Sequence, residues 1–232
     1  MFEKAVTGNR EAIYAILGSP PLPPNAITPS LGTAFMVATG LLVTAARCIL
    51  DAAKPGDPPQ GKVRVIRAPD IGRKAEPAAV IAADARKDLA LLRIDAPRSA
   101  ACLQLLDAPV PAGTHCGTSG FPRIAVDSGP VTGVSLIELF QGADISSFVS
   151  DTDSNGDTMS RYETDSPLYG DSSGCPGFVA SGEVFGMFHQ CGRHPWPGVS
   201  LWVPSMEIIA FLNDNGVIIS GRRTSRGGIA KW

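Results

Sequence analysis

Three separate segments of this 232-residue chain carry residue types suited to nucleophilic catalysis. They are residues 44–48 (TAARC), residues 88–92 (DLALL) and residues 170–176 (GDSSGCP). A serine hydroxyl becomes a good nucleophile when a neighbouring base, usually an imidazole, takes its proton, and a buried carboxylate can orient that base. The third segment supplies serines and the second supplies an aspartate. The segments thus contain two of the three residue types that hydrolysis through a serine nucleophile uses.

Residues so far apart in the chain need a rigid scaffold to bring them together, and the sequence predicts one made of strands. Short apolar runs recur between glycine and proline turn signals, which is typical of an all-β sandwich or a pair of barrels. The predicted strands lie at residues 33–37, 41–44, 62–66, 89–94, 131–139, 145–151, 158–164, 177–179 and 184–189.

Two prolines and a glycine at residues 106–113 interrupt the strand rhythm and divide the chain into comparable halves. Residues 10–17 predict a short helix, and Ser205 is placed to cap a closing helix. The predicted units are a helical and Pro-rich lead-in (1–29), a first half (30–107), a second half (108–204), a helix (205–216) and a flexible basic tail (217–232). We expect the tail to be a free terminus or a tether to a partner domain or protein.

Composition excludes several classes of partner. A formal net charge of −2 gives no overall positive field for nucleic acid. No run of 18 apolar residues exists, so no membrane span is expected. The beginning of the chain lacks the basic start and apolar stretch of a secretory signal, and five cysteines cannot all pair internally. Reduced thiols and a cytoplasmic location are therefore expected.

In order, the three segments resemble the motifs of the trypsin-like serine proteases, which have the chymotrypsin fold. In that family Thr-Ala-Ala-His-Cys carries the base, Asp-(Ile/Leu)-Ala-Leu the orienting acid and Gly-Asp-Ser-Gly-Gly-Pro the nucleophile. The resemblance covers about residues 30–214. It implies an all-β fold of two antiparallel six-stranded barrels with a short N-terminal and a C-terminal helix. It also implies a serine endopeptidase with Asp88 as its acid, a peptide or protein substrate, no metal and no cofactor.

Position 47 departs from the family, because Arg47 stands where relatives have the catalytic histidine. A guanidinium keeps its proton wherever proteins are folded, so it cannot act as a general base. Loss of that base costs orders of magnitude in rate, and we expect an inactive or strongly impaired peptidase. Arg47 would either form a bidentate bridge to Asp88 or turn outward from a vestigial site. The alternative function is a pseudoprotease that binds peptides or proteins as a regulatory module.

Two neighbouring serines compete for the position of the nucleophile. Ser173 gives the Ser-Gly-x-Pro form found in many bacterial and viral relatives, whereas Ser172 leaves the proline one place late, so Ser173 is favoured. Ser173 would then share the oxyanion site with Asp171, where the family usually has glycine. An aspartate there restricts the backbone and adds negative charge beside a developing anion.

The resemblance also suggests a substrate pocket formed by Pro167, Phe188, His189 and Gln190. Pro167 stands where members that cleave after basic residues hold an aspartate, so a small or apolar pocket is expected. His189 could hydrogen-bond Asp88 and partly replace the missing base, because an imidazole can accept a proton near neutral pH. The other interpretation of His189 is an ordinary half-buried side chain, and we expect His115 and His194 to be structural.

A rival motif lies at residues 151–157 (DTDSNGD), which resembles the first half of an EF-hand calcium loop. Its twelfth position is Tyr162 rather than an acidic residue. We favour a β-hairpin turn at Asn155 and Gly156 between two strands, with calcium as the alternative.

Overall fold

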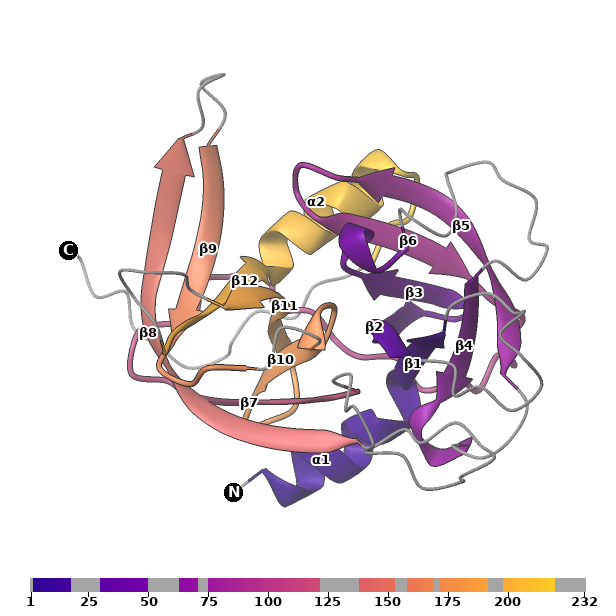
Figure 1. Ribbon diagram of the computed structural model, residues 1–232, viewed down its shortest axis with the longest axis horizontal. Helices are drawn as coiled ribbons and strands as arrows, with labels where there is room; N and C mark the ends of the chain where they lie inside the picture. The colour runs from indigo at the N-terminus through magenta and orange to yellow at the C-terminus, as the bar shows by residue number, and fades with distance from the viewer. Residues whose placement is uncertain are drawn as a thin grey trace, which may run out of the picture.

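The structure, a computed structural model, describes residues 2–17, 30–49, 63–70, 75–121, 138–152, 158–168, 172–191 and 198–219. Its strands form two closed barrels, each of six antiparallel strands (Figure 1). The predicted all-β fold is therefore confirmed.

The first barrel is closed in the order β1-β2-β3-β6-β5-β4. Its strands are β1 (Ile13–Leu17), β2 (Ser30–Ala38), β3 (Leu41–Thr44), β4 (Val63–Arg67), β5 (Glu76–Asp84) and β6 (Leu89–Arg93). Aliphatic side chains fill most of its interior, with Leu42, Leu91 and Leu92 among those that are completely buried.

The second barrel is closed in the order β10-β11-β12-β9-β8-β7. Its strands are β7 (His115–Gly120), β8 (Leu139–Thr152), β9 (Thr158–Thr164), β10 (Pro176–Val179), β11 (Val184–Cys191) and β12 (Ser200–Pro204). Aromatic rings fill this interior: Phe185 packs 5.3 Å from Trp202 and 5.5 Å from Tyr162 between ring centroids. The two halves share an architecture but differ in how they are packed.

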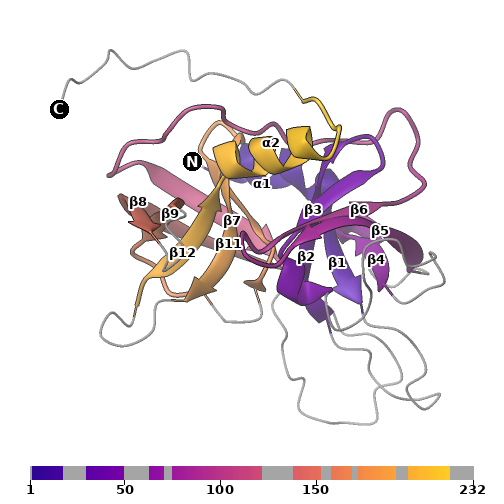
Figure 2. The same cartoon turned by 90° about the horizontal axis from the view of Figure 1, so that it is seen from above.

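Two α-helices and three short 3-10 helices complete the described chain. They are α1 (Glu3–Asn9), η1 (Arg10–Ala12), η2 (Ala46–Cys48), η3 (Ala68–Asp70) and α2 (Ser205–Asp214). α2 lies across both barrels and contacts β6, β11 and β12 (Figure 2). Ser205 does not cap it: Pro204 is the N-cap, and Ser205 Oγ donates to the carbonyl oxygen of Leu106 at 2.5 Å. No helix in the described part of the chain could cross a membrane.

The helix predicted over residues 10–17 is wrong, because residues 13–17 form β1 of the first barrel. Both faces of this strand are buried: Tyr14 and Ile16 point into the barrel core, whereas Ile13 and Leu17 pack in a separate cluster outside it. The first barrel therefore begins before residue 30. The sequence does not predict β5, β7 and β12, and most of the strand predicted at residues 131–139 lies outside the described residues.

The predicted hairpin around residue 155 is confirmed in its strands, since β8 and β9 pair from Ile145↔Thr164 to Thr152↔Thr158. The turn itself, residues 153–157, lies outside the described residues, as do His194 and residues 220–232 of the tail. Within the described ranges, no group of His, Cys, Asp and Glu side chains could hold a metal ion.

Candidate active site

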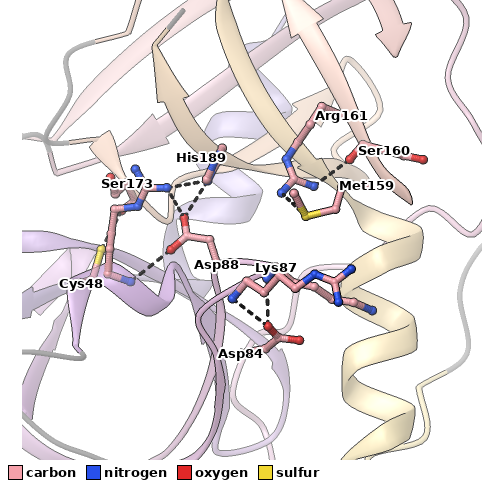
Figure 3. Close-up of polar contacts among 11 residues, drawn as sticks. Cys48, Asp84, Lys87, Asp88, Met159, Ser160, Arg161, Ser173 and His189 are labelled. Atoms are coloured by element: carbon pink, nitrogen blue, oxygen red, sulfur yellow. Dashed lines mark hydrogen bonds and ion pairs between the residues drawn. The ribbon is translucent and has the colours of Figure 1, made fainter. Parts of the chain in front are cut away.

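The residues predicted to act together meet between the two barrels (Figure 3). The first barrel supplies Arg47, in η2 directly after β3, and Asp88, in the turn before β6. The second barrel supplies His189 on β11 and Ser173 in the turn before β10. Hydrogen bonds across the junction join these elements.

Asp88 is the centre of this cluster and only 4% exposed. Its Oδ1 accepts the backbone N–H of Arg47 at 3.1 Å, and its Oδ2 lies 2.7 Å from Arg47 Nη2 and 2.8 Å from His189 Nδ1. Arg47 thus turns toward the carboxylate rather than outward. The bridge uses one guanidinium nitrogen and the backbone amide, not the two guanidinium nitrogens of the predicted bidentate form.

The backbone of Asp88 adopts a left-handed conformation, with φ of 58°. Aspartate is one of the few residues other than glycine that tolerates it. This conformation ends the turn after β5 and starts β6 with the carboxylate directed at the other barrel. The Asp-Leu-Ala-Leu segment is therefore a turn residue followed by a buried strand.

The pKa of Asp88 is lowered by its partners. Burial alone would raise it, but the contacts with His189 and Arg47 favour the ionised form and outweigh burial. The site therefore holds a buried carboxylate anion next to a guanidinium.

Arg47 and Asp88 both contact the same ring nitrogen of His189. Its Nδ1 lies 2.5 Å from Arg47 Nη2 as well as 2.8 Å from Asp88 Oδ2. A ring nitrogen either donates its proton or accepts one, so Nδ1 cannot donate to Asp88 and accept from Arg47 at the same time. The contact with Asp88 corresponds to one of the two interpretations that the sequence left open for His189.

Ser173 is held against the first barrel through its backbone. Its carbonyl oxygen accepts the N–H of Thr33 at 2.9 Å and the thiol of Cys48 at 3.6 Å. The next residue, Gly174, has φ of +85°, and a Cβ there would collide with the carbonyl oxygen of Thr33. Glycine is therefore required at position 174 by the close approach of the two barrels, and Ser173 lies beside Cys48, the residue after Arg47.

The rival serine lies in a different environment. Ser172 lines a small cavity in the second barrel together with Thr118, Leu139 and Leu168. Asp171, the predicted partner of Ser173 in the oxyanion site, lies outside the described residues.

The four predicted pocket residues do not share one cavity. Pro167 is exposed and lines a surface cavity of about 490 Å³ with Leu139 and Phe140. Phe188 is instead completely buried in the second barrel, where it packs on Trp202 at 5.5 Å. His189 faces Asp88, and Gln190 follows an irregularity in the pairing of β11 with β12.

Cysteine does not offer a competing nucleophile. All five cysteines are free thiols, and burial raises the pKa of Cys48 and of Cys175 to about 12. Both thiols next to the site are therefore protonated at neutral pH. Cys175 instead donates to Thr33 Oγ1 at 3.2 Å, a structural bond between the barrels.

Sequence reasoning missed Arg161, a buried arginine on β9 that lies near the same junction (Figure 3). Its only signal is a single cation within a predicted strand, next to the core residue Tyr162. Strand alternation predicts that such a residue points outward, but not what it faces.

Comparisons with known proteins agree with this architecture. No curated protein matches the sequence. Among solved structures, the chain is similar to the active form of the Rv3671c protease from M. tuberculosis, with 19% identity over 93% of this chain and 85% of that one, and a TM-score of 0.66. The inactive form gives 18% identity over 92% of this chain and 93% of that one, with a TM-score of 0.65. The family described as trypsin-like peptidase domain matches residues 32–187. This chain therefore belongs to the trypsin-like peptidase domain family.

Proposed function

We propose that this chain is a serine protease domain that binds peptides or proteins between its barrels but cleaves them very poorly, because Arg47 occupies the position of the general base. One observation carries the proposal. Arg47 Nη2 lies 2.7 Å from Asp88 Oδ2, so a permanently protonated side chain takes the place beside the acid that a triad gives to its imidazole.

The chemistry of the pair supports this assignment. In a triad the carboxylate holds the base in place, and the base takes the proton of the serine. Arg47 satisfies the carboxylate of Asp88, but a guanidinium has five donors and no acceptor. Arg47 therefore cannot take the proton of Ser173.

The pairing of β11 in the second barrel supports peptide binding by this chain. β10 pairs with β11 only as far as Met187, and β12 covers one edge of the following residues through Gln190 and Cys191. Among the described strands, none pairs with the other edge of residues 189–191. An extended peptide can add to such an edge through its backbone hydrogen bonds.

Replacing the arginine tests the proposal. We expect Arg47→His to cleave a quenched fluorescent casein at least about 100-fold faster than the wild type, since a positioned base contributes 10²–10⁴-fold. A fluorophosphonate probe should label Ser173 in this variant and leave the wild type unlabelled. Arg47→Lys is the matched control, because lysine keeps the positive charge, and Ser173→Ala in the Arg47→His background should remove the gained activity.

Two results would contradict the proposal in different ways. Cleavage by the wild type at the rate of Arg47→His would mean that another base operates, and loss of that activity in His189→Gln would identify it. An inactive, folded Arg47→His protein that still binds peptides would favour the pseudoprotease, with a defective oxyanion site.

A further inference from the structure

Arg161 is the most deeply buried arginine or lysine among the described residues. It is 9% exposed. Within the described residues, its guanidinium donates to the carbonyl oxygen of Ser160 at 2.8 Å and lies 3.7 Å from the sulfur of Met159. No carboxylate in the described part of the chain forms an ion pair with it. A buried charge without a counterion is costly, so the described residues give no stabilising reason for burying Arg161.

The strand pattern places Arg161 at the edge of the interface between the barrels. The neighbouring Tyr162 points into the second barrel, so Arg161 points outward. On the same outer face, Val203 and Met187 pair across β12 and β11 and pack into the apolar cluster of the first barrel and α2. On the other side, Val149 pairs with Arg161 and is partly exposed. Arg161 thus lies where the covered interface gives way to the surface.

The acidic groups that act on Arg161 have ion-pair partners of their own. Glu207 and Asp88 both raise the pKa of Arg161, although burial and Arg47 lower it. Glu207, however, pairs with Lys87 at 3.3 Å, and Asp88 is held by Arg47. The two carboxylates that act on Arg161 are therefore each already in an ion pair with another cation, Glu207 with Lys87 and Asp88 with Arg47.

We propose that Arg161 is a specificity residue that binds an acidic side chain, Asp or Glu, of a peptide held between the barrels. The proposal rests on the peptide-binding function proposed above and names its substrate class. A guanidinium matches a carboxylate with two parallel hydrogen bonds, and such a pair is strengthened where water is largely excluded. The apolar side chain of Val149 is next to it and suits the methylene groups of a glutamate. Binding would supply the ion-pair partner that Arg161 does not have among the described residues.

Peptide twins that differ by one charge test the proposal. The probes are fluorescein-labelled octapeptides of Ala, Ser and Leu, blocked at both ends, with Glu or Gln at one position that is scanned along the peptide. We expect fluorescence anisotropy to show, at one position, binding of the Glu peptide about tenfold tighter than of its Gln twin. Arg161→Gln should abolish the preference, and Arg161→Lys should keep part of it. Arg93→Gln, at an exposed site on β6, should leave it unchanged.

The failures of the two proposals are distinguishable. Peptides that bind with no preference for Glu at any position would overturn the role of Arg161 and leave the peptide-binding function standing. Peptides of either kind that do not bind would overturn both. If a Gln peptide with a free C-terminus gains as much as the Glu peptide, the carboxylate is that of a chain end, and the assignment to a side chain is wrong. A thermal melt of each variant identifies any that fails to fold, and the Glu and Gln comparison on the wild type needs no variant.

Discussion

Two arginines at the junction between the barrels show opposite combinations of burial and pairing. The side chain of Arg47 is 41% exposed and has a buried carboxylate 2.7 Å away. Arg161 is 9% exposed and has no carboxylate partner among the described residues. Stability favours the reverse, since the more buried charge has the greater need of a counterion. Arg47 is therefore explained as the ion-pair partner of Asp88, whereas Arg161 is better explained by a ligand than by the fold.

Removing the charge of Asp88 should have the largest effect. Asp88→Asn leaves Arg47 and His189 around a neutral side chain, and we expect the free energy of unfolding in urea to fall by about 3 kcal/mol at pH 7. Asparagine tolerates the left-handed backbone, so the loss reports charge rather than strain. The control is Asp70→Asn, whose carboxylate pairs with the part-exposed Arg67 and should cost less than about 1 kcal/mol. Equal losses in the two variants would mean that the buried Asp88–Arg47 pair stabilises the fold no more than the part-exposed Asp70–Arg67 pair.

Replacing each arginine by methionine separates the two cations directly. Arg47→Met removes one hydrogen-bond donor from the buried carboxylate of Asp88. Because the guanidinium that is lost was partly exposed to solvent, we expect a loss of about 1 kcal/mol. Arg161→Met removes a buried charge that has no carboxylate partner in the described part of the chain, so stability should be unchanged or about 1 kcal/mol higher. The measurement is again urea unfolding. A larger loss for Arg161→Met than for Arg47→Met would reverse the comparison and count against a ligand-binding role.

The dependence on pH should follow Asp88. Its pKa in the folded protein is below the usual carboxyl value because of His189 and Arg47. Such a group stabilises the fold above the usual value of about 4 and loses that contribution as pH falls through the folded value. The difference in stability between wild type and Arg47→Met should therefore be complete at neutral pH and shrink below about pH 4. For Arg161→Met the difference should change little over the same range. Urea midpoints measured down to acidic pH decide between these outcomes.

The smallest expected effect is on the reactivity of Cys48, the residue after Arg47. Its pKa is raised to about 12 by burial, so iodoacetamide should modify the exposed Cys102 in the native protein and reach Cys48 only after opening. Arg47→Met should accelerate the labelling of Cys48 several-fold, and Arg161→Met should not. Labelling followed by peptide mass spectrometry gives both rates. Rapid labelling of Cys48 in the wild type would show that η2, which carries Arg47 and Cys48, opens readily.

The motifs of the sequence, through the family they resemble, were sufficient for the two-barrel fold, and a contact of Asp88 with Arg47 and with His189 was among the alternatives they left open. The chemistry at these positions is local, since each residue sits at the end of a strand whose pattern is clear. The sequence was insufficient for β1, because Ile13–Leu17 is buried on both faces and an apolar run of this kind suits a helix or a strand equally. It was also insufficient for Arg161, because the environment of an outward-facing residue is set by α2 and the turn before β6, which are distant in the chain.

The C-terminal helix connects the two barrels next to the candidate active site. α2 contacts β6 of one barrel and β11 of the other, its first residue bonds to the segment between the barrels, and Glu207 pairs with Lys87 beside Asp88. The helix thus holds the two barrels together at the junction where we propose that a peptide binds. A force or a cut acting on residues 205–214 would loosen both halves together.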